Sequence, residues 1–362
     1  MADKTPIQWT ATINKDGSIT PGATWNPIRA RNLETEKLGW HCEVVSAGCC
    51  KPGDITCYAN QINKGFFNLG TGLPYTRESR EKVDIFLDEE TLLQPLRWRK
   101  PRKIFVCSMT DWMGEWVPDE WIDRILTVAA LCPQHTFQFL TKRAERLPRY
   151  FGSKRDYLTL LVDNGPNWGV DDVDFDNAVI RLKRPLPNLW LGVSCEDQKT
   201  ADERIPHLLQ APAAVRFVSA EPLLARVNLR GLLLSDERTA ECACGHGHGF
   251  SRCPNTGSVA QTCHRCDCKR FRRINGIHQV IIGGESGPGA RPLDLAWVRA
   301  IIRQCEAAGV ATFVKQLGKT SITQNGEPYQ WTDHKGGDMK EWPADLRVRE
   351  FPINLKSEEA VH

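Results

Sequence analysis

Short apolar runs that each end in polar residues recur along the chain, and they constrain its fold more than any other feature. These β-branched runs cover residues 103–111, 137–143, 189–196, 215–222, 279–286 and 311–316. Continuous apolar runs of this length suit strands that are buried on both faces, as in parallel sheets. Helical patterns lie between them, including one that begins at Pro118 and one that ends at Gly309. The sequence therefore predicts alternating strands and helices.

The spacing of the runs predicts a βα repeat. Neighbouring strand ends lie about 30 residues apart, the size of a βα unit, except across two longer gaps. The gaps contain a polar, glycine-rich segment at 164–179 and a cysteine-rich segment at 241–273, which we interpret as insertions. With an initial strand near the first cysteines, roughly six or seven βα units remain. The predicted fold class is α/β, a full or partial parallel βα barrel, with a doubly wound open sheet as the rival architecture.

Composition fits one large globular domain with insertions. The chain has 362 residues, of which 41% are hydrophobic and 25% charged, and its net charge of +3 selects no class of partner. Residues 1–18 lack the apolar core of a signal peptide, and we expect a cytoplasmic protein without a membrane-spanning segment. We assign residues 1–318 to the barrel, with a cysteine loop at 41–59. Residues 238–274 form a metal-binding insertion within it, and residues 319–362 form a C-terminal extension.

Polar residues stand directly after every predicted strand. Active sites of parallel βα barrels gather at the C-terminal ends of the strands. Any single residue there could be a solvated loop residue, but charges that follow buried strands need partners, so six such ends favour a shared polar cavity. The polar ends are Asp111, Thr141, Lys142, Arg143, Ser194, Glu196, Glu221, Glu285, Ser286, Lys315 and Gln316. The candidate catalytic residues among them are Asp111, Lys142, Arg143, Glu221, Glu285 and Lys315.

The cysteines indicate metal binding. In a reducing compartment, the 14 cysteines are better interpreted as metal ligands than as a disulfide framework. Ten of them fall into two groups, Cys42 to Cys57 and Cys242 to Cys268. The other four lie alone in apolar segments, which is typical of small core residues. These four are Cys107, Cys132, Cys195 and Cys305.

The first group resembles a loop that binds an iron-sulfur cluster. Cys42, Cys49 and Cys57 provide three thiolates on a glycine-containing segment. Three ligands leave one iron of a 4Fe-4S cluster open to a substrate or cofactor, whereas a structural zinc site is closed by four protein ligands. His41 or Cys50 could supply a fourth ligand, so zinc stays an alternative. The wide C-x6-C-x7-C spacing matches no tight zinc knuckle and, ahead of βα units, favours the open cluster.

Eight short motifs occur in order along the chain. They are WNP at 25–27, the cysteine segment at 42–59 ending in CYA, SMTD at 108–111, LTKR at 140–143, GVSCE at 192–196, SAEPLL at 219–224, GGESGPGARP at 283–292 and FVKQLG at 313–318. This series resembles the three-Cys-motif, radical-SAM-like family found in phages and bacteria, over residues 7–318 without the two insertions. The resemblance implies a full or incomplete βα barrel, S-adenosylmethionine bound to the open iron, and an electron donor as partner.

Two departures from the family pattern bear on the ligands. The usual GCxxCYA is lengthened here to GCCKPGDITCYA, so either Cys49 or Cys50 is the second ligand, and the preceding Gly48 favours Cys49. The glycine-glycine-acid motif of radical SAM enzymes follows an early strand, whereas GGES here follows a late one. We therefore carry no role in binding the methionine amino group over to Glu285.

The resemblance also implies roles for the strand-end residues. A deoxyadenosyl radical would abstract a substrate hydrogen, while the protein positions the reactants and excludes water. As cofactor-binding residues, Ser194 and Glu196 would hydrogen-bond ribose hydroxyls. The lysines and the arginine at the strand ends suit a carboxylate or phosphate. The acidic residues would orient amines or transfer protons.

The second cysteine group predicts a zinc site. Residues 242–268 hold six cysteines and three histidines with little apolar material, so the segment needs a metal to fold. Cys242 or Cys244, together with Cys263 and Cys266, resembles a zinc ribbon. The alternatives are a second iron-sulfur cluster and a disordered loop. The alternative ligands are Cys253, Cys268, His246, His248 and His264.

Two basic segments with an aromatic residue, at 95–103 and 269–273, could grip phosphates and stack on a base, although solvated surface is the plainer interpretation. They make a nucleic acid or nucleotide the leading candidate substrate. We thus predict a radical-SAM-like enzyme. The alternatives are a non-catalytic, zinc-stabilised nucleic-acid-binding protein and a metal-dependent barrel hydrolase.

Overall fold

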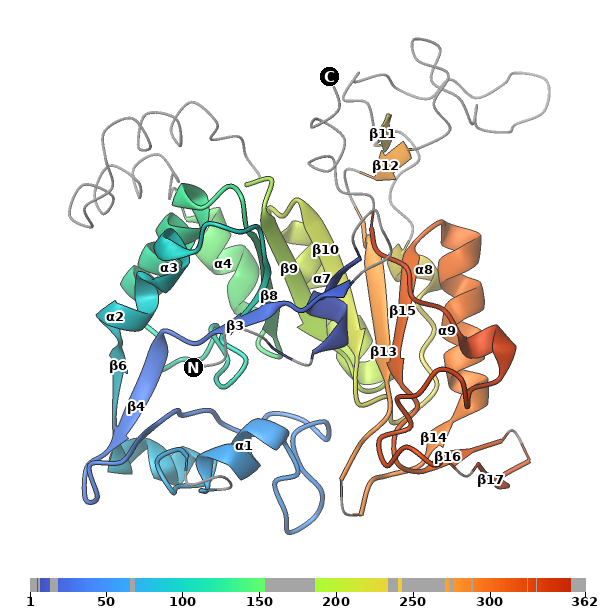
Figure 1. Cartoon of the computed structure of the whole chain (residues 1–362), viewed down its shortest axis with the longest axis horizontal. Coiled ribbons are helices and arrows are strands. Elements are labelled where there is room, and N and C mark those ends of the chain that lie inside the picture. The colour runs from blue at the N-terminus through green and yellow to red at the C-terminus, as the bar shows by residue number, and fades with distance from the viewer. Residues whose placement is uncertain are drawn as a thin grey trace. The chain divides into compact units, whose positions relative to one another are not determined.

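The computed structural model describes most of the chain as two compact units, residues 1–214 and 215–362 (Figure 1). The described residues are 5, 7–13, 19–65, 69–153, 186–233, 240–242, 271–273, 276–287, 289–323, 325–329 and 331–352. Each unit has its own parallel strands and its own helices, so the two are considered in turn.

The first unit is built on four parallel strands. In spatial order these are β9 (Leu189–Ser194), β8 (Thr136–Thr141), β7 (Lys103–Val106) and β3 (Ala23–Trp25). Among the described residues, the helices α3 (Asp119–Leu131), α4 (Arg146–Gly152) and α7 (Gln198–Gln210) accompany them. α7 packs on β9 and on α4, so this parallel sheet carries helices as a βα fold requires.

Local sequence explains these elements. Every residue of β9 is buried, as expected for a strand that is covered on both faces. α3 follows Pro118, and the apolar side chains of Ile122, Ile125 and Leu126 belong to its buried face. α7 begins with a capping box, in which Asp197 accepts a hydrogen bond from the backbone N–H of Thr200.

A long excursion separates β3 from β7 and carries the first cysteines. It contains an antiparallel sheet in the order β5 (Leu38–Gly39), β4 (Ile28–Asn32) and β6 (Val83–Leu87). It also contains α1 (Tyr58–Asn63) and α2 (Glu89–Leu92). The strands β1 (Thr12–Ile13) and β2 (Ile19–Thr20) form a separate antiparallel pair near the N-terminus. The described residues of the unit also include the short 3-10 helices η1 (Gln8–Thr10), η3 (Arg77–Lys82) and η4 (Gln94–Arg97).

The second unit contains three parallel strands in the order β15 (Ala311–Gln316), β13 (Gln279–Gly283) and β10 (Val215–Ala220). Its main helix, α9 (Leu295–Ala308), packs on β15 and ends at Gly309, which adopts the left-handed conformation with φ 63°. The smaller elements are α8 (Arg230–Leu233), β11 (Ala240–Cys242), β12 (Phe271–Arg273), β14 (Leu293–Asp294), β16 (Ser321–Ile322), β17 (Pro328–Tyr329) and η7 (Ala344–Leu346).

All six predicted apolar runs contain a parallel strand, so the α/β class with parallel βα units is confirmed. Closure of the strands into a full or partial barrel stays a prediction. The insertion at 164–179 lies outside the described residues, as does most of the cysteine-rich segment. The two ends of that segment pair as the antiparallel strands β11 and β12. In the described ranges, no helix is both long enough and apolar enough to cross a membrane.

Candidate functional site

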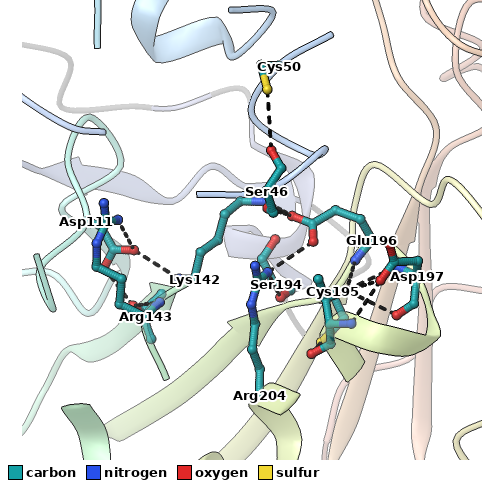
Figure 2. Close-up of polar contacts among 12 residues, drawn as sticks. Ser46, Cys50, Asp111, Lys142, Arg143, Ser194, Cys195, Glu196, Asp197 and Arg204 are labelled. Atoms are coloured by element: carbon teal, nitrogen blue, oxygen red, sulfur yellow. Dashed lines mark hydrogen bonds and ion pairs between the residues drawn. The ribbon is translucent and has the colours of Figure 1, made fainter. Parts of the chain in front are cut away.

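The polar strand ends of the first unit lie together at one edge of its sheet (Figure 2). The carboxyl ends of parallel strands share an edge, which places the residues after β7, β8 and β9 side by side. Arg143 Nη1 donates to Asp111 Oδ2 at 3.3 Å, and the Lys142 ammonium forms an ion pair with Glu196. The structure thus brings together four of the predicted residues.

The Asp111 carboxylate is surrounded by donors from its own chain. Its Oδ1 accepts hydrogen bonds from the Thr141 hydroxyl at 2.6 Å and from the backbone N–H of Met113 at 3.0 Å. Its Oδ2 accepts from the backbone N–H of Lys142 at 3.0 Å and from Arg143. Asp111 therefore joins the turn after β7 to the end of β8, and it acts on the site by positioning Lys142 and Arg143.

Glu196 is fully buried, and, as in Asp111, both of its carboxylate oxygens accept hydrogen bonds. Its Oε1 accepts from Ser46 Oγ at 2.8 Å and from Lys142, while its Oε2 accepts from Arg204 Nη1 at 3.0 Å (Figure 2). Burial opposes the charged form, but the charges of Lys142 and Arg204 and the hydrogen bonds outweigh it, so the pKa of Glu196 lies below its ordinary value. In the described structure this carboxylate faces protein donors. Its predicted role in binding ribose is not tested.

Ser194 is buried at the end of β9, and its backbone carbonyl accepts a hydrogen bond from Arg204 Nη1 at 2.7 Å. Arg204 therefore ties α7 both to Ser194 and to Glu196. Neither Arg204 nor Ser46 was among the predicted site residues. Arg204 lies within an ordinary helical pattern and Ser46 within a loop, so only the folded chain reveals that both reach Glu196.

Three of the four clustered cysteines lie near one another. Cys42, Cys49 and Cys57 lie close enough to interact electrostatically in all three pairs. Burial is the main cause that raises the pKa of both Cys42 and Cys57, and the neighbouring thiols raise it further. Asp111 also raises the pKa of Cys42, whereas Arg143 lowers it. The cysteine loop therefore brings three predicted ligands together beside the strand ends.

The path of the loop explains how the lengthened spacing is accommodated. The backbone N–H of Cys49 donates to the Ser46 carbonyl at 2.9 Å, and that of Cys57 donates to the Cys49 carbonyl at 3.1 Å. Between them the chain turns back on itself at the antiparallel bridge of Lys51 with Asp54. The extra residues thus form a turn that returns Cys57 to Cys49.

Cys50 takes a different direction. Its sulfur lies 3.8 Å from the Ser46 carbonyl (Figure 2). Lys142, by contrast, interacts electrostatically with Cys49, and this interaction helps to raise the pKa of Lys142 against the effect of burial. These contacts distinguish the two adjacent cysteines, and the choice of Cys49 as the second ligand stays a prediction.

A small apolar cluster packs against two of the thiols. Cys42 and Cys57 pack against Ala59, Tyr75 and Met109. This floor is fixed by polar contacts, because the Tyr75 hydroxyl donates to the Met109 carbonyl at 2.6 Å. The thiols thus lie in surroundings of low polarity beside the charged strand ends.

The guanidinium of Arg143 lies 4.6 Å from the ring centroid of Trp116, and its Nη2 donates to the Glu43 carbonyl at 3.1 Å. Sequence reasoning did not single out Tyr75, Trp116 or Glu43. Each of them has an unremarkable local pattern.

Two of the resemblance motifs meet at this site. The Asn26 side-chain oxygen, in the WNP motif, accepts hydrogen bonds from the Met109 backbone N–H at 3.1 Å and from the Ser108 hydroxyl at 3.2 Å, in the SMTD motif. This contact fixes the start of the excursion after β3 to the turn after β7.

The second unit brings its own strand-end residues together. Lys315 Nζ lies 2.5 Å from Glu221 Oε1, which pairs the ends of β15 and β10. Glu285, after β13, accepts from Arg291 through the side-chain Nη2 at 2.7 Å and Nε at 3.1 Å and through the backbone N–H at 2.8 Å. Glu285 therefore holds its own glycine-rich loop, and Gly284 has no room for a Cβ beside the Leu317 carbonyl.

No three His, Cys, Asp or Glu side chains among the described residues lie close enough together to bind a single metal ion. The zinc-ribbon prediction is not tested, because Cys244, Cys263 and Cys266 lie outside those residues and only the backbone of Cys242 is described. The 95–103 basic segment leads into the beginning of β7, at the opposite end of the strand from Asp111.

Comparison with protein-family models matches residues 20–343 to one family, described as a protein of unknown function (DUF5131). Comparison with curated proteins found no match, and comparison with solved structures found none either. The matched region includes the cysteine loop and all seven parallel strands of the two units.

Proposed function

The chain belongs to the DUF5131 family, and from its geometry we propose that it is a radical-SAM-like iron-sulfur enzyme. In this proposal Cys42, Cys49 and Cys57 hold a 4Fe-4S cluster with one open iron. The observation that carries it is the approach of these three thiols to one another, with Cys50 turned towards the Ser46 carbonyl. Three neighbouring thiols are the donor set that such a cluster requires.

When bound, the cluster and S-adenosylmethionine would supply reductive cleavage and hydrogen abstraction, with an external electron donor. The chain's own residues prepare the site for that chemistry. The apolar floor of Ala59, Tyr75 and Met109 covers one side of Cys42 and Cys57. Arg143 and Lys142 bring positive charge next to Cys42 and Cys49, which stabilises an anionic group there.

The contacts of the remaining strand-end residues indicate their roles. Asp111 orients Lys142 and Arg143, since its carboxylate accepts from both. In the second unit, Glu221 and Lys315 form a pair that is only partly exposed, at 19% and 23% of their side-chain surfaces. This pair is the second unit's candidate for contacting a polar substrate.

A nucleic acid or nucleotide is the proposed substrate class, and its support is limited to charge. The side chains of Arg97, Arg99 and Lys100 are exposed, and the Arg102 guanidinium lies 4.7 Å from the Trp98 ring centroid. Because this basic surface precedes β7, it would contact a long substrate away from the cysteines. A zinc-stabilised nucleic-acid-binding protein is the alternative function.

Metal analysis of the anaerobically purified protein tests the proposal. We expect about four irons and four sulfides per chain and a change in the paramagnetic resonance spectrum on adding S-adenosylmethionine. Cys42→Ala and Cys57→Ala should lose the iron, whereas Cys107→Ala, in the buried core after β7, is the matched control that should keep it. Zinc alone, after anaerobic reconstitution has also failed to install iron, would refute the proposal.

A further inference from the structure

Gly48 presses directly on the side chain of Glu196. A Cβ at position 48 would lie 2.3 Å from Glu196 Oε1, 2.4 Å from its Cγ and 2.7 Å from its Cδ. Real Cβ atoms do not approach other atoms this closely, so either the loop or Glu196 would have to move. The need for glycine here comes from space alone, because the backbone of Gly48 is not in the left-handed region.

Glu196 is in turn held by cations that lie outside the cysteine loop. Lys142 at the end of β8 and Arg204 in α7 both form ion pairs with its carboxylate, and neither cation belongs to the loop. Ser46, two residues before Gly48, donates its hydroxyl to the same carboxylate at 2.8 Å. The loop therefore has one polar and one steric contact with a carboxylate that is fixed to the sheet.

These contacts lead directly to the cysteines. The Ser46 carbonyl accepts the backbone N–H of Cys49, and the Cys49 carbonyl accepts that of Cys57, so fixing Ser46 and Gly48 restrains the backbone of both cysteines. The same Ser46 carbonyl lies 3.8 Å from the sulfur of Cys50, whereas Lys142 interacts electrostatically with Cys49.

We propose that Glu196 is a positioning residue that holds the cysteine loop through Ser46 and Gly48, and that this attachment selects Cys49 instead of Cys50 as the second cluster ligand. The selection of Cys49 rests on the proposed function. The positioning of the loop does not, because it concerns the chain's own contacts and can be measured without metal.

Alkylation of Cys49 in the metal-free, full-length protein tests the positioning. If the attachment holds the loop, its loss raises the population of open loop and the reaction rate with iodoacetamide, measured by mass spectrometry. We expect a roughly tenfold faster reaction in Ser46→Ala, the scale of losing one hydrogen bond to a charged group. Ser46→Thr keeps the hydroxyl and should restore the slow rate, a rescue that general loosening of the fold would not give.

A double variant tests the steric contact. Gly48→Ala should also speed alkylation of Cys49, whereas Gly152→Ala is the control, since a Cβ there meets nothing within 4 Å. In a Glu196→Ala background the obstructing atoms are gone, so Gly48→Ala should add less than about twofold. The buried thiols of Cys107 and Cys132 report unfolding in each variant. If Glu196→Ala exposes them, Glu196→Asp provides the shortened side chain instead.

Iron content tests the selection of the ligand. Cys49→Ala should lose the cluster, and Cys50→Ala should keep it together with its spectrum. Loss in Cys50→Ala and retention in Cys49→Ala would overturn the selection. Equal alkylation rates in Gly48→Ala, Ser46→Ala and the Gly152→Ala control, or an equal effect of Gly48→Ala in both backgrounds, would overturn the positioning. A wild-type protein that takes up no iron would refute the proposed function and the selection, while the alkylation rates would still decide the positioning.

Discussion

Replacing Lys103 with methionine should remove a pH dependence of stability that this buried lysine creates. Lys103 begins β7, and its ammonium donates to the Ala11 carbonyl at 3.1 Å and lies 5.8 Å from the ring centroid of Trp190. Burial lowers the pKa of Lys103 from 10.5 to about 8. The charged form is therefore disfavoured in the folded protein relative to the unfolded chain.

The size and sign of the effect follow from these two pKa values. They differ by about 2.5, and each pKa unit corresponds to about 1.36 kcal/mol. Charged Lys103 therefore lowers the free energy of unfolding by about 3 kcal/mol. Between pH 8 and pH 10.5 the unfolded chain binds more protons than the folded protein, so stability rises with pH across this window. Below pH 8 Lys103 is charged in both the folded and the unfolded state, so burial of the ammonium destabilises the folded protein by the full amount.

The measurement compares the free energy of unfolding in urea for the wild type and Lys103→Met. We expect the difference between the two proteins to shift by about 3 kcal/mol between pH 7 and pH 10.5, in the sense that the methionine variant is relatively more stable at pH 7. Lys100→Met, at an exposed neighbouring position, is the control, and its effect should stay within about 0.5 kcal/mol at both values. A difference that does not change with pH for Lys103→Met would refute the reasoning.

Three further substitutions test other contacts. Asp111→Asn places an amide N–H₂ opposite hydrogen-bond donors that in the wild type face a carboxylate oxygen. It should therefore reduce the free energy of unfolding in urea by about 3–5 kcal/mol, and a loss below about 1 kcal/mol would contradict this. Gly283→Ala places a Cβ 2.9 Å from the Glu221 Cδ and should cost about 1–3 kcal/mol in the same measurement, but little in a Glu221→Ala background. Gly309→Ala, at φ 63°, should lower stability by about 1–2 kcal/mol, and an unchanged denaturation midpoint would show that the helix end adapts.

The strands and several helix ends could be predicted because their signals are local. A mostly apolar run of six residues, such as the one that forms β9, is buried on both faces in a parallel sheet. This preference does not depend on distant parts of the chain. Pro118 and Gly309 mark helix ends through their own backbone preferences. The gathering of Asp111, Lys142 and Glu196 at one edge followed from the same pattern, since parallel strands end on the same side.

The antiparallel sheet of β4, β5 and β6 was not predicted. β4 has the sequence IRARN, in which arginines alternate with small or apolar residues, and it is too short and too charged to stand out. The guanidiniums of Arg29 and Arg31 lie over Trp40 and Phe86, 5.2 Å and 5.7 Å from the ring centroids. Those aromatic partners come from distant positions in the chain.

The sequence by itself determined the alternation of strands and helices, the edge at which the polar residues gather, and the presence of three cysteines ahead of the strands. Only the tertiary structure decided which groups those residues contact. Gly48 is next to Cys49 in sequence, but its need for glycine is set by Glu196, and the contact of the Cys50 sulfur with the Ser46 carbonyl exists only in the folded loop. The reason is physical: strand and helix preferences act over a few residues, whereas hydrogen bonds, ion pairs and close packing join atoms far apart in the chain, so they exist only once it has folded.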